Sequence, residues 1–189
     1  MDPTSGPAAE LASGPRLPRW PGGLVPLLLA LLLAAPAAGS VGTRANPYRL
    51  GSLVREGGFA ARVLAVDTNA WRSLRRANPA ARRPAPGFSD VLVTIRVTNR
   101  TKTAGIPFVD GALDAVGPSR ERYTSLTDSC GTIPGDVSSI SPVPAGKTVT
   151  VHACWQVWTL DVRSLVMYFA PYGSGRTTYF ALHRSAGRG

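Results

Sequence analysis

Five arginines within a twelve-residue stretch form the densest set of chemically active side chains in this sequence. No Asp or Glu interrupts the stretch, and a tryptophan immediately precedes it. Guanidinium groups bind phosphate and carboxylate through paired hydrogen bonds, and they also stack on aromatic rings. These residue types predict an anion-binding or partner-binding surface made of Trp71, Arg72, Arg75, Arg76, Arg82 and Arg83.

The composition of the chain offers a second explanation for the same cluster. The sequence has 21 Lys+Arg against 11 Asp+Glu, a formal net charge of +10, and its only lysines are Lys102 and Lys147. A GC-rich genome supplies Arg, Ala, Gly and Pro wherever a surface tolerates them. The sequence alone leaves both interpretations open, a binding surface and a compositional effect.

The two cysteines, Cys130 and Cys154, predict one disulfide if the chain is exported; two free thiols or a metal pair are the alternatives. Closing a loop of this length stabilises a fold by roughly 3–4 kcal/mol in the chain-entropy account. Cys154 alternates with His152 and Gln156 on the more polar side of an expected strand. We therefore expect the bond to attach the loop over residues 128–139 to the outer face or rim of a sheet.

Catalytic and metal-binding patterns were sought and none is present: HExxH, GxSxG, Walker and GxGxxG motifs do not occur. The two histidines, His152 and His183, are interpreted as surface residues of strands. Calcium binding by an acidic loop stays an alternative, although no pair of carboxylates has EF-hand spacing. The pairs in question are Asp110 with Asp114 and Asp128 with Asp136. We expect no catalytic residue, no metal site and no cofactor.

The tripeptide Asn99-Arg100-Thr101 fits the pattern of an N-glycosylation site. It follows directly on the clearest strand of the sequence. Asn is also common in turns, because its side chain bonds to nearby backbone groups. We interpret Asn99 as the first residue of a turn.

The N-terminal 40 residues predict a secretory signal peptide. Arg16 and Arg19 precede the apolar block of residues 24–38, and small residues follow it. This block has 15 residues and contains Pro26 and Pro36, whereas a membrane span needs about 20. We expect a signal peptide over 1–40, a short lead over 41–47, one domain over 48–184 and a flexible tail over 185–189.

Short runs of alternating apolar and polar residues fill most of the expected domain. Alternation with period two is typical of strands that bury one face, and Gly and Pro separate the runs. In the second run, Phe59, Ala61, Val63 and Ala65 should share the buried face. The runs cover residues 48–54, 59–66, 91–98, 106–116, 149–158, 165–169 and 180–182, of which 106–116 reads as a weaker pair of short strands.

One helix interrupts this pattern. The residues Asp67, Thr68 and Asn69 are good N-caps, and residues 70–77 favour a helix with Trp71 and Leu74 on one side. Pro79 ends it, because the residue before a proline avoids the helical region. The fold class we predict is all-β: an immunoglobulin-like antiparallel β-sandwich of about seven strands with one short helical insertion.

An ordered set of segments in this chain resembles a family of secreted immunoglobulin-like domains of unknown function, from actinobacteria and other Gram-positive bacteria. The segments are 46–51 (NPYRLG), 59–63 (FAARV), 77–79 (ANP), 88–99 (FSDVLVTIRVTN), 154–157 (CWQV), 164–169 (SLVMYF) and 179–182 (YFAL). The expected fold is also similar to that of a small mycobacterial secreted immunogenic antigen. The resemblance implies this fold and export. It implies no activity, because the family has no agreed catalytic residues.

These observations favour an exported, non-enzymatic binding or accessory module at the cell envelope. The main alternative is a secreted hydrolase whose site the sequence does not reveal, and a third is a periplasm-like or wall-associated structural protein without a ligand. Expected partners are an anionic cell-envelope polymer or an exported protein. We expect no nucleic-acid partner, because export removes the chain from nucleic acid. We also expect no membrane span after signal cleavage, a monomer, and a secreted or cell-wall location.

Overall fold

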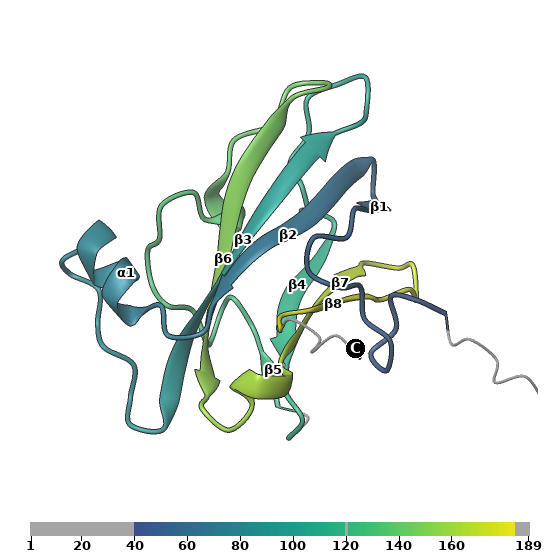
Figure 1. Ribbon diagram of the computed structural model, residues 1–189. Helices are drawn as coiled ribbons and strands as arrows, with labels where there is room; N and C mark the ends of the chain where they lie inside the picture. The colour runs from purple at the N-terminus through teal and green to yellow at the C-terminus, as the bar shows by residue number, and fades with distance from the viewer. Residues whose placement is uncertain (1–39, 120, 184–189) are drawn as a thin grey trace, which may run out of the picture. The chain divides into compact units, whose positions relative to one another are not determined.

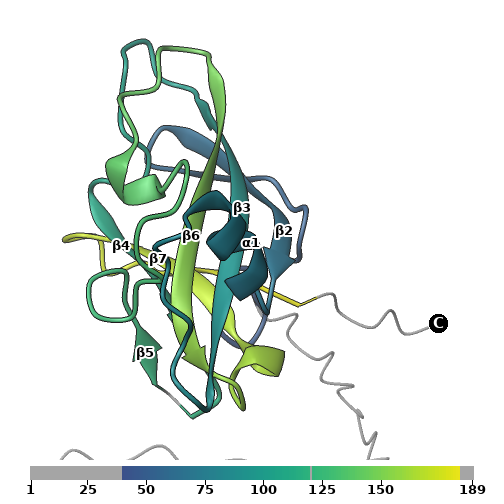
Figure 2. The same ribbon diagram turned by 90° about the vertical axis from the view of Figure 1, so that its left-hand side faces the viewer.

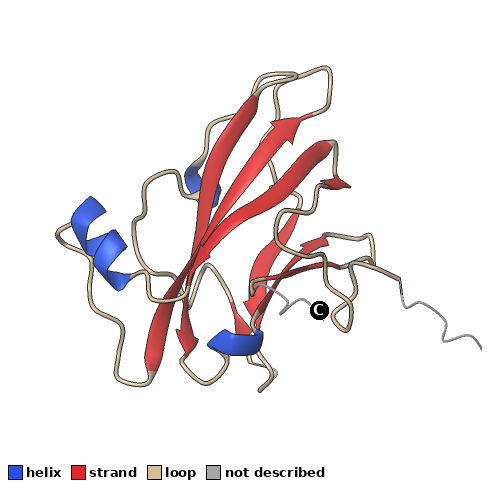
Figure 3. Ribbon diagram, in the orientation of Figure 1, coloured by secondary structure: helices blue, strands red, loops and turns tan. Residues whose placement is uncertain are grey.

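Two four-stranded antiparallel sheets form the molecule (Figure 1). The computed structural model describes residues 40–119 and 121–183. The expected signal peptide, except Ser40, and the expected tail lie outside the described residues. Strands dominate the described part, together with α1 (Trp71–Ala77) and two short 3-10 helices, η1 (Val137–Ser139) and η2 (Val162–Ser164) (Figure 3).

The first sheet has the order β1-β2-β3-β6 and the second the order β5-β4-β7-β8. The strands of the first are β1 (Val54–Glu56), β2 (Phe59–Asp67), β3 (Phe88–Asn99) and β6 (Thr148–Trp158). Those of the second are β4 (Gly111–Val116), β5 (Arg122–Tyr123), β7 (Val166–Pro171) and β8 (Thr178–Ala181). The prediction of an all-β antiparallel sandwich is confirmed, with eight strands in the described part rather than about seven.

The connectivity is immunoglobulin-like. Strand β3 pairs with β6 in one sheet, and β4 pairs with β7, which pairs with β8, in the other. This is how strands B and E, and strands C, F and G, pair in immunoglobulin domains. The disulfide differs, because it does not join the two sheets.

The core lies between the sheets and is built from the alternation of the long strands. On β3 the inward residues Val91, Val93, Ile95 and Val97 are fully buried. On β6 the inward residues include Val151, Trp155 and Val157, which share one cluster with Met167 and Phe169 of β7 and with Leu165, the residue just before β7. Alternation with period two predicted these faces because a strand turns successive side chains to opposite sides.

The alternation fails in β2, where the register shifts between Val63 and Ala65. Val63 pairs with Ile95 and Ala65 with Thr94, so Leu64 is an extra residue without its own partner. This β-bulge reverses the facing of the strand, as an inserted residue must. The prediction that Ala65 is buried was wrong: Ala65 is exposed, and Val66 packs against the core instead.

Two other strand predictions were wrong. Residues 48–53 form no strand; Tyr48 makes only an isolated bridge to Phe180 before β1 begins at Val54. Residues 106–110 form no strand, 107–110 being turns, and β4 begins at Gly111. Phe108 in these turns has φ +62°, a left-handed conformation that is rare for an aromatic residue, and it packs edge-to-face on Phe169.

Asn99 ends β3 and is fully buried. Its amide donates hydrogen bonds to the carbonyls of Thr103 at 2.7 Å and Val143 at 2.8 Å. Its side-chain oxygen accepts from the backbone and hydroxyl groups of Thr101. Asn99 is thus the last residue of the strand and not the first of a turn, although its side chain holds the turn that follows; a buried amide with these partners is not open to glycosylation.

Candidate binding surface on helix α1 and the connector to β3

Helix α1 lies over the outer face of β3 and β6, outside the main core (Figure 2). It is held there by a second, smaller cluster of buried side chains. The cluster consists of Ala70, Leu74, Cys130, Ile133 and Cys154, with Leu92 packed against it. Docking through Leu74 is confirmed. Docking through Trp71 was wrong, because Trp71 is only half-buried and Ala70 occupies the contact.

The disulfide between Cys130 and Cys154 is part of this cluster. The two Cα atoms are 5.6 Å apart, and Cys154 pairs with Leu92 across β3 and β6. Leu92 and Cys154 are on the outer face, since their neighbours Val91 and Trp155 point into the core. The bond therefore attaches the loop of residues 128–139 to the outer face of the first sheet, as the alternation predicted, and the same loop supports α1.

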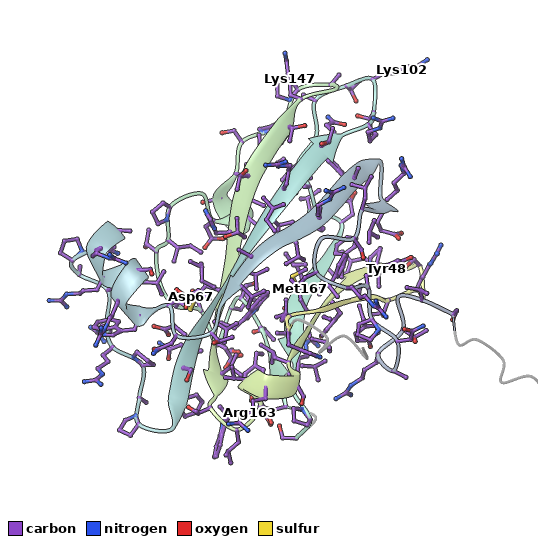
Figure 4. The ribbon with its side chains drawn as sticks, in the orientation of Figure 1. Tyr48, Asp67, Lys102, Lys147, Arg163 and Met167 are labelled. Atoms are coloured by element: carbon purple, nitrogen blue, oxygen red, sulfur yellow. A yellow bond between two sulfur atoms is a disulfide. The ribbon has the colours of Figure 1, made fainter. Side chains whose placement is uncertain are left out.

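The two ends of α1 agree only in part with the prediction from the sequence. Ala70 is the N-cap residue, not one of Asp67, Thr68 and Asn69. Asp67, which Figure 4 labels, instead accepts hydrogen bonds from the Asn69 backbone and, at 3.3 Å, from the Ser73 hydroxyl. At the other end Asn78 is extended and closes the helix before Pro79, as predicted.

The five arginines of the cluster are all exposed. Arg75 contacts both the helix and the connector. Its guanidinium carbon is 5.8 Å from the Trp71 ring centroid, and one of its nitrogens donates a hydrogen bond to the Ala81 carbonyl at 3.3 Å. In the described ranges 40–119 and 121–183 the one ion pair joins Arg122 to Asp114, far along the chain from this cluster. The cluster therefore faces solvent without a carboxylate within ion-pair distance among those residues.

A surface groove runs beside the cluster, between the start of α1 and the connector to β3. Its volume is about 500 Å³, and it is lined by Asn69, Trp71, Arg83, Pro84, Ala85, Pro86, Gly87 and Phe88. The connector is extended because its prolines exclude a helix. The structure thus brings Trp71 and Arg83 together in one groove, with Arg75 against Trp71. It places Arg72, Arg76 and Arg82 on the same helix and connector, exposed but outside the lining of the groove.

Two aromatic residues of this surface were missed by the sequence interpretation. Phe88 closes the groove, and Trp158 is its register partner across β3 and β6. Their ring centroids are 5.4 Å apart at an interplanar angle of 60°. Trp158 is 52% exposed. The alternation of β6 could have predicted the position of Trp158, because Trp158 lies on the same side of the strand as Gln156 and Cys154, which is the outer face.

Two buried polar centres lie at the edges of this surface, outside the lining of the groove. The Asp161 carboxylate accepts hydrogen bonds from Tyr123 Oη at 2.8 Å and from the Ser119 hydroxyl. Burial and this carboxylate raise the pKa of Tyr123 to about 12. Asp90 is buried on the outer face of β3 beneath the Ala70 region, where burial raises the pKa of its carboxyl group. The Asp161 carboxylate thus anchors the segment that contains Ser119, and among the described residues no histidine is hydrogen-bonded to either carboxylate.

The remaining candidate chemical groups have structural partners. His152 lies 3.3 Å from the Thr94 hydroxyl and is half-buried, whereas His183 is exposed. Asp128 and Asp136 accept hydrogen bonds from nearby turn residues, and Asp114 pairs with Arg122. Across residues 40–119 and 121–183, no group of three or more His, Cys, Asp or Glu side chains lies close enough together to hold a metal ion.

Comparisons with known proteins extend the description of the fold only. No protein-family profile and no curated protein matches the sequence. Among solved structures, the chain is similar to an uncharacterized β-sandwich protein from Clostridium difficile 630, with 12% identity, a TM-score of 0.49, and coverage of 73% of this chain and 95% of that chain. It is also similar to a conserved hypothetical protein from Bacillus anthracis, with 12% identity, a TM-score of 0.45, and coverage of 70% and 94%.

A third similar structure is the yjhA protein from Bacillus subtilis, with 11% identity, a TM-score of 0.45, and coverage of 72% and 99%. The three proteins come from Gram-positive bacteria, and the first is described as a β-sandwich. The actinobacterial and secreted aspects of the family resemblance stay predictions.

Proposed function

We propose that this protein is an exported, non-enzymatic binding module of the cell envelope and that the surface of α1 and the connector holds an anionic polymer. One observation carries the proposal: five exposed arginines lie on α1 and the connector beside a groove that Trp71 and Arg83 line, and no carboxylate of the described residues pairs with them. Guanidinium groups in this state are ready to exchange water for phosphate or carboxylate groups.

The arginines stand on a rigid support. Leu74 and Ala70 bury the inner side of α1 against Leu92, and the disulfide holds the loop beneath it. Because the backbone that carries the arginines is already fixed, binding has to order their side chains but not the chain itself, so more of the interaction energy appears as affinity. Mutual repulsion among the arginines is also relieved when an anion binds, which adds to the preference for a polyanion.

The proposed location rests on two further features. A disulfide persists in an oxidising compartment, and the N-terminal segment has the three parts of a secretory signal. None of the helices within the described residues is long and apolar enough to cross a membrane. An exported basic domain meets the anionic polymers of the envelope directly.

The proposal is tested by binding measurements with poly(glycerol phosphate) and polygalacturonate as the anionic polymers. The test variant replaces Arg72, Arg75, Arg76, Arg82 and Arg83 by Glu. The matched control makes the same replacement at five other exposed arginines, Arg49, Arg55, Arg62, Arg100 and Arg176. Circular dichroism and thermal unfolding check that both variants fold.

We expect the cluster variant to lose at least about tenfold in affinity and most of its dependence on salt, while the control keeps more than half of both. Equal losses in the two variants would mean that net charge alone attracts the polymer, and the proposed site would be wrong. Absence of binding by the unmodified protein to either polymer would overturn the proposed function itself.

A further inference from the structure

An aromatic strip continues the groove across the end of the first sheet. Trp71 and Phe88 line the same groove, and Phe88 contacts Trp158 with ring centroids 5.4 Å apart. Trp71 is half-buried and Trp158 is 52% exposed. Three aromatic residues from α1, β3 and β6 thus follow one another from the groove onto the end of the first sheet.

The exposure of Trp158 is built into a rigid turn. The Thr159 backbone donates a hydrogen bond to the Gly87 carbonyl at 2.9 Å, and the Thr159 and Ser89 hydroxyls are 3.1 Å apart. The Asp161 backbone donates to the Trp158 carbonyl at 2.8 Å, and the Asp161 side chain is itself anchored to Tyr123. These hydrogen bonds before and after the turn keep the Trp158 indole exposed to solvent, although burial of the indole would be favourable.

The remainder of the groove also suits a ligand with an apolar face and polar edges. Pro84 and Pro86 contribute ring surface and lack backbone N–H groups, whereas Asn69 and Arg83 contribute polar groups. The volume of about 500 Å³ is within the range of about 300–1,000 Å³ that is typical of small-ligand sites. The groove is thus large enough for one or two sugar rings.

We propose that the polymer bound at this surface is an acidic polysaccharide whose sugar rings stack on Trp71 and Trp158; this inference rests on the proposed function above. A pyranose ring has one flat face of C–H groups that packs on an aromatic ring, and hydroxyls at its edges. A carboxylate on the same ring pairs with a guanidinium, and two guanidinium groups are available at the Trp71 end of the strip, from Arg75 and from Arg83. A polymer of phosphates alone uses the arginines and leaves the aromatic strip without a role.

The test compares two polycarboxylates that differ in their sugar rings. Polygalacturonate carries one carboxylate on each pyranose ring, and polyglutamate carries carboxylates on a peptide chain. The variants are Trp158→Ala and, for the other end of the strip, Trp71→Leu. The matched control is Tyr172→Ala, which removes an aromatic side chain that is 73% exposed at the distant turn between β7 and β8.

We expect Trp158→Ala and Trp71→Leu each to weaken polygalacturonate binding by about threefold to tenfold and to leave polyglutamate binding within about twofold. Tyr172→Ala should change neither. Polygalacturonate should also shift the indole fluorescence of the unmodified protein, and this shift should shrink in each Trp variant, because Trp155 is buried in the core.

The outcomes separate this inference from the proposed function. If both polymers bind equally and the Trp variants bind like the unmodified protein, the inference of a sugar ligand is overturned. In that case loss of binding in the five-arginine variant still supports a general polyanion site. If poly(glycerol phosphate) binds more tightly than polygalacturonate and is insensitive to both Trp variants, the ligand is a phosphate polymer and the inference is also overturned.

Discussion

Tyr123 Oη donates a hydrogen bond of 2.8 Å to the carboxylate of Asp161, and this bond joins β5 of the second sheet to the crossover that leaves β6 of the first. Asp161 also accepts from the backbone and hydroxyl of Ser119. Gly117 packs so closely against this carboxylate that a side chain there would collide with it. The crossover carries Trp158 at its start, so the same bond helps to fix one end of the proposed binding surface.

Replacing Asp161 by Asn should lower the pKa of Tyr123 from about 12 toward the ordinary value near 10, because a negative neighbour is removed while burial remains. Since the pKa is raised in the folded state, the stabilisation is present below the ordinary pKa and is lost as pH rises through about 12. A tyrosinate absorbance titration, taken as the difference from Tyr123→Phe, measures this. An unchanged Tyr123 pKa in Asp161→Asn would contradict the assignment.

Asp90→Asn should raise the free energy of unfolding at neutral pH by about 1 kcal/mol. Asp90 is buried, one of its carboxylate oxygens has no partner among the described residues, and burial raises its pKa. A raised pKa means that the wild type loses stability as pH rises through the folded-state value, so the advantage of Asn should vanish near the ordinary pKa of 3.8. Urea unfolding across this pH range tests it, with the exposed Asp110→Asn as the control.

Removing the disulfide with Cys130→Ser and Cys154→Ser should lower the free energy of unfolding by roughly 3–4 kcal/mol. The bond lies in the small cluster under α1, so hydrogen exchange should increase first in α1 and in the loop of residues 128–139, and least in β3. If exchange increased equally in both sheets, the disulfide would stabilise the whole sandwich and not mainly the support of α1.

Asn99→Ala should lower the free energy of unfolding by about 3 kcal/mol, because two carbonyls and one backbone N–H each lose the side chain to which they are hydrogen-bonded. Ser141→Ala serves as the control, because Ser141 is exposed in the connection between η1 and β6. It should lower the free energy of unfolding by less than about 0.5 kcal/mol. Both values come from denaturant unfolding. A small cost at Asn99 would show that water replaces these bonds easily.

Arg62→Glu should stabilise the protein by about 0.2–1 kcal/mol at low salt. Arg62 and Arg96 are register partners on the exposed outer face of β2 and β3, where like charges repel each other. The gain should fall as salt is added, and Arg62→Gln should give about half of it. Thermal unfolding at several salt concentrations measures the effect. A loss of stability in Arg62→Glu would mean that the two guanidinium groups do not repel.

The sequence by itself was sufficient for the features that depend on local periodicity. Alternation along β3 and β6 identified the buried valines, and the same alternation put Cys154 on the outer face, where the disulfide was then found. Proline and asparagine chemistry ended α1 at Asn78 and predicted the turn that the Asn99 side chain holds. These features follow from backbone geometry over a few neighbouring residues, which any strand or turn of the same sequence shares.

Tertiary structure alone decided the features that depend on distant pairing. The bulge at Leu64 exposes Ala65. The alternation of the sequence does not predict this bulge, because the register of β2 is set by its partner strand β3. Trp71 proved half-buried because Ala70 and the distant Ile133 and Cys130 fill the space beneath α1. The groove and the aromatic strip exist only because pairing of β3 with β6 brings Trp158 to Phe88, seventy residues apart along the chain. The sequence thus determined which residues carry charge and aromatic surface, and long-range strand pairing determined which of them meet.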